Sequence, residues 1–157
     1  MDARSLVVEI LLRAIALEEH FATSAFMEGP GRELKERAER TGGTLASLVS
    51  QLVDVGDGRV AAMDAAGVDL QALSLTAPGV EQLDAEEANI LALETNAALA
   101  KAIERHPARF FGLAALPVAD PRAAVAEMER VACAFSWSEK DPGGVWLTRK
   151  ETSCSVS

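Results

Sequence analysis

The sequence contains no tyrosine, and aromatic residues make up only 4% of its 157 positions. A core must therefore be built from leucine, isoleucine, valine and many alanines, and the hydrophobic fraction of 49% is sufficient for one. Basic residues are also few: 15 lysines and arginines stand against 24 acidic residues, for a formal net charge of -9. This charge argues against a nucleic-acid or anionic-membrane partner, because both require clustered lysine and arginine.

Cysteine is scarce: Cys133 and Cys154 form no CxxC pair and have no neighbouring histidine. A secreted disulfide scaffold would hold more cysteines, so we expect a reducing, cytoplasmic compartment. The amino-terminal run MDARSLVVEILLR is interrupted by Glu9 and is followed by no small-residue cleavage site, so we do not expect a signal peptide. No apolar run of the sequence is long enough to span a bilayer.

The sequence does contain apolar and helical segments that alternate between turn signals. The patterns predict strands at 13–18, 69–75 and 109–117, and helices at 31–40, 44–54, 58–66, 84–106 and 120–132. The longest helix has Asp84 as its cap, Glu87 three residues later and Pro107 at its end. The last predicted helix has Asp120 as its cap and Pro121 at its first position. Strands separated by helices predict parallel pairing and an α/β class. Periodicity alone does not separate a (β/α) barrel from an open doubly wound sheet.

The segment IALEEHF (15–21) holds two carboxylates beside one of the two histidines. In a helix, Glu18 and His20 would point to nearly opposite sides, because each residue turns the helix by about 100°. In a strand, residues two apart face the same way, so this pair would project together with Glu19 turned away. A carboxylate oxygen and an imidazole nitrogen are both ligands for zinc or manganese. The residues alone leave both interpretations open.

Three blocks of the sequence resemble blocks of a known protein family and follow one another in the same order as there: IALEEHF, MDAAGVDLQALSLTAPGVEQL and RHPARFFGLAALPVADP. They resemble the N-terminal part of the amidohydrolase-related decarboxylases, which include the gamma-resorcylate, 2,3-dihydroxybenzoate and aminocarboxymuconate semialdehyde decarboxylases. The resemblance covers Ile15 to Ala132 and implies about the first three βα units of a metal-dependent (β/α)₈ TIM barrel. It divides the chain into an N-terminal extension at 1–13, the barrel part at 14–132 and a tail at 133–157. The tail departs from the family pattern, and we expect it to be irregular and non-native or disordered.

The resemblance also implies a site. Glu18 and His20 match the family's first pair of metal ligands, for a divalent ion that we expect to be zinc or manganese. Ser74 and Thr76, near the end of the second strand, are candidate substrate contacts. The family's later His ligand, and its Asp that also moves a proton, have no match here, so no catalytic residue is assigned. His106 precedes a proline at a helix end and is not assigned to the metal.

The reaction that the resemblance implies is non-oxidative loss of CO₂ from a small aromatic or unsaturated carboxylic acid. A divalent metal would anchor and polarise the carboxylate, and a glutamate in place of a histidine at the first ligand favours the decarboxylases. One alternative is a metal-dependent hydrolase of the same superfamily. Another is a non-catalytic fragment that self-associates, as a homo-oligomer, through exposed sheet edges. Because two ligands alone hold a metal weakly, we expect little or no turnover from this chain by itself.

Overall fold

The computed structural model describes residues 13–134. Its helices and strands, in chain order, are β1 (Ile15–Phe21), α1 (Ser24–Glu28), α2 (Arg32–Thr41), α3 (Gly43–Val53), α4 (Asp57–Ala66), β2 (Leu70–Leu75), α5 (Ala85–Arg105), β3 (Phe110–Gly112) and α6 (Pro121–Ala134). This alternation confirms the predicted α/β class. Apart from residue 13 and the last turn of α6, the expected extension and tail lie outside the described residues. Within the described part, no helix combines the length and the apolar character that crossing a membrane requires.

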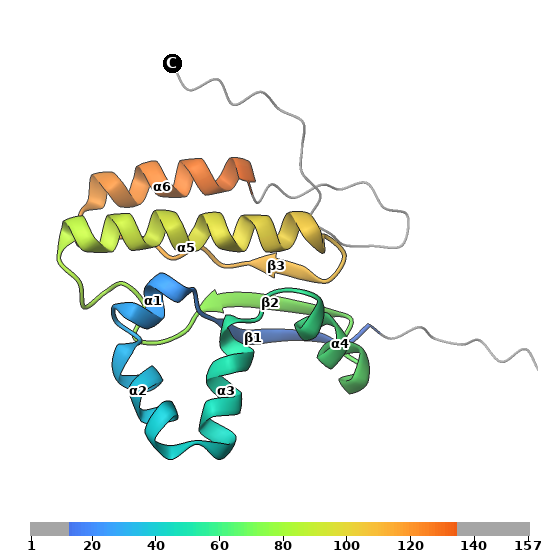
Figure 1. Ribbon diagram of the computed structural model, residues 1–157. Coiled ribbons are helices and arrows are strands. Elements are labelled where there is room, and N and C mark those ends of the chain that lie inside the picture. The colour runs from blue at the N-terminus through green and yellow to red at the C-terminus, as the bar shows by residue number, and fades with distance from the viewer. Residues whose placement is uncertain (1–12, 135–157) are drawn as a thin grey trace, which may run out of the picture.

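The strands form one parallel sheet in the order β1-β2-β3, as the alternation of strands and helices predicted. The connection from β1 to β2 runs through α1 to α4, and the connection from β2 to β3 is the single long helix α5. Figure 1 shows α5 and α6 side by side along the sheet, and α2 and α3 as a hairpin that extends away from it. Neighbouring strands of the sheet are therefore also consecutive strands in the chain.

Both crossovers cover the same face of the sheet. Phe21, Leu73 and Phe110, one from each strand, pack in a single buried cluster with Met63 of α4 and Leu99 of α5. Each of these side chains is at most 2% exposed. Full burial of one such side chain stabilises a fold by about 1.5–3 kcal/mol, so this cluster holds the helices to the strands.

A second buried cluster fixes the α1–α3 excursion. Phe26 and Met27 of α1 contact Leu52 of α3 and Ala88 in the first turn of α5. A backbone hydrogen bond of 2.8 Å from the N–H of Ala22 to the carbonyl of Leu52 joins the chain after β1 to the end of α3. The segment that follows β1 is therefore anchored at the carboxyl end of the strand.

The structure corrects the predicted ends of two strands. β1 runs from 15 to 21 rather than 13 to 18, because its polar last half still pairs with β2 through His20 and Phe21. β3 covers only 110–112 of the predicted 109–117. Beyond it, the N–H of Ala115 donates to the side chain of Asn96 at 2.9 Å instead of to a strand, and Pro117 has no N–H to offer.

The predicted helix starts are confirmed. The Asp84 carboxylate accepts a hydrogen bond of 2.9 Å from the backbone N–H of Glu87 at the start of α5. Asp120 accepts one of 2.9 Å from the N–H of Arg122, with Pro121 as the first residue of α6. Side-chain caps of this kind satisfy N–H groups that a helix cannot pair internally.

Candidate metal centre

The Glu-Glu-His triplet lies in the last half of β1, so the helical interpretation of this segment is wrong. The pairing with β2 shifts just before Glu19, so that Glu18 and its preceding neighbour both lie opposite Ala72. His20 then pairs with Ser74. Because Ala72 and Ser74 are two residues apart on β2, they belong to one face of the sheet. The bulge therefore places Glu18 and His20 on this same face, away from the helices.

Glu19 belongs to the opposite face. It pairs with Leu73, whose side chain is fully buried beneath the helices. The separation of Glu19 from its two neighbours is the one that the strand interpretation predicts. The three polar residues therefore do not form one cluster, because only Glu18 and His20 share a face.

The imidazole of His20 already has one partner. Its Nδ1 lies 3.1 Å from the hydroxyl oxygen of Ser74 on the neighbouring strand. When Nδ1–H donates to this oxygen, the lone pair on Nε2 is available to a ligand. Ser74, predicted as a substrate contact, thus contacts the candidate metal ligand directly. Thr76 follows β2, and its backbone N–H donates to the carbonyl of Phe21 at 2.9 Å.

A cavity of about 440 Å³ borders the free edge of β1. It lies between this strand, α3 and α4, and its polar lining consists mainly of Glu18, Glu19, His20, Gln51, Arg59 and Gln71. Glu18 and His20 border this cavity at the edge of β1, whereas Glu19, Arg59 and Gln71 line it on the helix-covered face.

Arg59 is the basic residue of this cavity. Burial lowers the pKa of its guanidinium, while the nearby carboxylates of Glu19 and Asp54 raise it. An arginine remains protonated in spite of such a shift, because its ordinary pKa lies far above neutral. The Arg59 guanidinium therefore places a fixed positive charge on the helix-covered side of β1, the face that Glu19 occupies.

The donor set fits part of a metal site. A carboxylate and an imidazole with an open Nε2 are suitable ligands for a divalent ion. Among residues 13–134, no group of three or more His, Cys, Asp or Glu side chains is arranged to hold one. Within the described residues, Glu18 and His20 therefore provide at most a portion of a coordination sphere.

His106 lies where the sequence predicted, at the end of α5. Its Nε2 is 3.2 Å from the Asp57 carboxylate, and its ring meets that of Phe110 edge to face at 5.6 Å between centroids. These contacts join the end of α5 to the start of α4 and to β3, so the histidine has a structural role.

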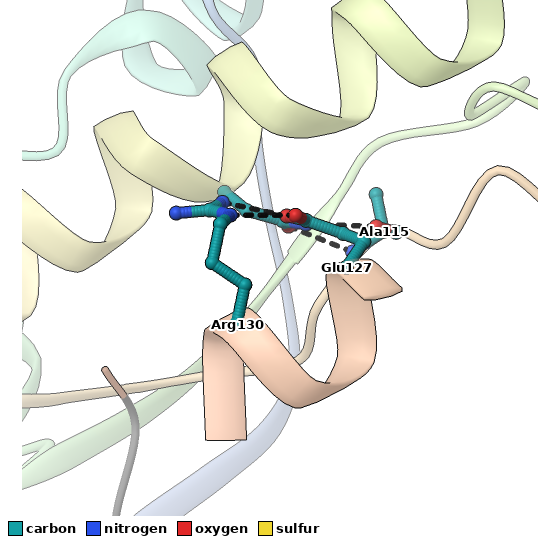
Figure 2. A network of polar contacts seen from close by, with 4 residues as sticks. Ala115, Glu127 and Arg130 are labelled. Atoms are coloured by element: carbon teal, nitrogen blue, oxygen red, sulfur yellow. Dashed lines mark hydrogen bonds and ion pairs between the residues drawn. The ribbon is translucent and has the colours of Figure 1, made fainter. Parts of the chain in front are cut away.

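A buried polar network between α5 and α6 is absent from the predictions. Asn96 donates to the carboxylate of Glu127 at 2.6 Å and to the carbonyl of Ala115 at 2.8 Å. Arg130 binds both oxygens of Glu127 at 2.6 Å, as Figure 2 shows. Burial tends to raise the pKa of Glu127, but the hydrogen bonds from Arg130 and Asn96 outweigh it, and the pKa lies below its usual value. The only signal in the sequence is polar residues within apolar helix faces.

Fold and geometry together define a class: a parallel α/β protein in which an acid and an imidazole share one face near the carboxyl end of the first strand. No family model matches the chain. It is 39% identical over 117 residues to the gamma-resorcylate decarboxylase of Polaromonas sp. (strain JS666 / ATCC BAA-500), an alignment that covers 74% of this chain and 34% of that protein. The chain thus spans about a third of the length of the curated relatives it matches.

Solved structures also match this chain over a little more than a third of their length, and they too are decarboxylases. The dihydroxybenzoic acid decarboxylase of Polaromonas sp. JS666, with bound manganese and 2-nitroresorcinol, matches with a TM-score of 0.64 and 39% identity over 77% of this chain and 35% of that one. The 5-carboxyvanillate decarboxylase of Novosphingobium aromaticivorans DSM 12444, with manganese and 4-hydroxy-3-methoxy-5-nitrobenzoic acid, matches with a TM-score of 0.70 and 31% identity over 79% and 39%. The resemblance to the N-terminal part of amidohydrolase-related decarboxylases is confirmed. A divalent metal agrees with the manganese bound to these relatives.

Proposed function

We propose that this chain forms the first βα units of a (β/α)₈ barrel and contributes Glu18 and His20 to the metal centre of a non-oxidative decarboxylase. The observation that carries the proposal is the bulge in β1, which puts these two donors on one face of the sheet. Active sites of such barrels lie at the carboxyl ends of the strands, where this pair is found.

The sheet supports a barrel in two ways. Its strands pair in chain order, and both crossovers cover one face only. On the edge strand, Ile15 is 40% exposed and Leu17 is 65% exposed. A barrel that closed at this edge would bury such side chains in its interior. The remaining ligands and the proton-transfer group would then come from later strands.

In this centre, the chain's own residues hold and orient the ion. Glu18 supplies a negative oxygen, which lowers the net positive charge of the site relative to an all-histidine set. His20 supplies Nε2, and Ser74 fixes its ring through Nδ1. When bound, the metal polarises the carboxylate of a substrate. Thr76 lies one residue past β2 and is a candidate substrate contact.

The substrate class follows from the relatives. The compounds bound to them, 2-nitroresorcinol and 4-hydroxy-3-methoxy-5-nitrobenzoic acid, each carry a planar nitro group beside a ring hydroxyl. A nitro group has the shape of a carboxylate, so we infer an aromatic acid with a hydroxyl group next to its carboxylate as the substrate. Zinc and manganese both suit the two donors of this chain.

Two alternative functions are each supported by one observation. A putative amidohydrolase from Staphylococcus aureus matches with 28% identity and a TM-score of 0.52, which supports a hydrolase in which the metal activates water. The unpaired edges of β1 and β3, within residues 13–134, support self-association as a homo-oligomer. Sedimentation of the purified chain distinguishes a monomer from such an assembly.

Manganese binding tests the site directly. The full chain is titrated with Mn²⁺ while the electron paramagnetic resonance signal of the free ion is recorded. We expect Glu18→Gln and His20→Ala each to weaken binding by about tenfold or more, since each removes a ligand. Glu94→Gln, which removes a carboxylate from an exposed part of α5, is the control and should leave the affinity unchanged. Equal affinities in all four proteins would refute the site.

A chimaera tests the reaction. Residues 15–132 replace the matching segment of the Polaromonas relative, and loss of CO₂ from 2,6-dihydroxybenzoate is measured. We expect turnover that Glu18→Gln abolishes. A chimaera that binds manganese and hydrolyses a lactone, yet releases no CO₂, would favour the hydrolase.

A further inference from the structure

Arg59 of α4 reaches the backbone of β1. Its Nη2 donates to the carbonyl oxygen of His20 at 2.8 Å and to that of Gln51 at 2.9 Å. Its Nε donates to the carbonyl of Asp54 at 2.7 Å, and its Nη1 to the side chain of Gln71 at 3.2 Å. One guanidinium therefore joins the end of α3, the segment after it, β1 and β2.

The contact with His20 is placed where β1 is least constrained by the sheet. Among the described residues, β1 has a partner strand on one side only, and a bulge interrupts its pairing just before Glu19. The direction of a side chain follows from the backbone at its own residue. A donor that fixes the carbonyl of His20 thereby limits where its imidazole can lie.

We propose that Arg59 is a positioning residue for the metal centre: its guanidinium fixes the backbone of His20 while Ser74 fixes the ring. The inference rests on the proposed function, because it assigns His20 as a ligand. Arg59 itself donates on the helix-covered side of β1 and is no ligand, since a guanidinium has no lone pair to offer a cation.

The chain supplies its own control in Arg109. This guanidinium also binds backbone carbonyls, those of Asp69 at 2.9 Å and Val68 at 3.0 Å, and it pairs with Asp64 at 2.7 Å. These contacts lie just before β2 begins, at the amino end of the sheet. Both arginines therefore brace a strand, but only Arg59 braces the strand end that carries the candidate ligands.

The sign of the effect separates positioning from simple electrostatics. Removing a positive charge near a cation site strengthens cation binding if charge alone matters. Removing a group that holds a ligand in place weakens it, and loss of such outer partners typically costs about 10–100-fold in metal affinity.

The experiment measures Mn²⁺ affinity by electron paramagnetic resonance and stability by urea unfolding, both on the full chain. We expect Arg59→Gln to weaken Mn²⁺ binding by about tenfold. Arg109→Gln should lower the urea midpoint to a similar extent but change the affinity by less than about twofold, because it acts away from the ligands. Unchanged or tighter Mn²⁺ binding by Arg59→Gln overturns the proposal, as does an equal loss in Arg109→Gln.

Arg59→Lys is the second variant, for the case in which Arg59→Gln does not fold. It keeps the charge but has one nitrogen in place of the fork that binds the backbone carbonyls, so we expect a weakening of at least about threefold. Wild-type affinity in Arg59→Lys overturns positioning by the guanidinium. If His20→Ala itself leaves Mn²⁺ binding unchanged, the assignment of the ligand has failed, which is a different result from the failure of Arg59 alone.

Discussion

Two polar clusters in this chain use similar side chains for opposite purposes. The strand-end cluster, Glu18, His20 and Ser74, is open to solvent at its two candidate ligands. The interhelical cluster, Asn96, Glu127 and Arg130, has a carboxylate that is only 2% exposed and an amide that is 1% exposed. In the interhelical cluster, both oxygens of Glu127 accept hydrogen bonds from within the protein.

The difference shows which carboxylate is available for chemistry. A buried carboxylate is tolerated only when it is paired and hydrogen-bonded, and then it has little capacity left for a ligand. Glu127 fulfils this condition and holds α6 against α5. Glu18 accepts no hydrogen bond from within residues 13–134 and is exposed, so its oxygens remain free for an ion. Burial and saturation therefore give Glu127 a structural role and leave the proposed ligand Glu18 available for binding.

The largest expected effect breaks the interhelical cluster. Glu127→Ala removes the acceptor of three short hydrogen bonds, and we expect a loss of about 2–3 kcal/mol in the free energy of unfolding. Glu18→Gln and the exposed α6 variant Glu129→Ala should each change it by less than about 0.5 kcal/mol. Urea unfolding measures all three. A Glu127→Ala chain as stable as the wild type would remove the distinction between the clusters.

The next effect is on acid unfolding. The pKa of Glu127 in the folded chain lies below its ordinary value of 4.5. Its contribution to stability is therefore complete above that value and is lost as the pH falls through the lower, folded value. Urea midpoints measured from neutral pH down to about pH 3 should fall less steeply in Glu127→Gln than in the wild type. Glu129→Gln, which changes an exposed glutamate of the same helix, is the control. Lys35 also lowers the pKa of Glu28, but this pair is unchanged in both variants and contributes equally to their pH dependence.

The smallest effect concerns the residue beside Asn96. Thr95 is fully buried, and within the described part of the chain its hydroxyl has no hydrogen-bond partner. Thr95→Val keeps the shape and removes an unsatisfied polar group, so we expect unchanged stability or a gain of up to about 1 kcal/mol. The exposed Thr44→Val is the matched control. A clear loss of stability in Thr95→Val would show that this hydroxyl has a partner and that the helix interface holds a larger polar network.

Much of the fold follows from local signals. The caps Asp84 and Asp120 were predicted because they depend on residues a few positions away. The end of β3 was not, because it depends on Asn96, which lies 19 residues earlier in the chain and replaces a strand partner. The strand state of residues 19 and 20 could be inferred only by resemblance, since the residues alone left a helix and a strand both open.

The sequence by itself determined the order of strands and helices, their caps and the Glu-x-His spacing, because these depend on side chains and turns that are near one another in the chain. Tertiary structure alone decided which carboxylate is buried and which is open, how the bulge turns Glu18 and His20 to one face, and which arginine braces that strand. Each of these depends on a partner 12 to 54 residues away, such as Gln71 for Arg59 or Ser74 for His20. Contacts over such separations are set by the packing of whole elements, which leaves little trace in local sequence patterns.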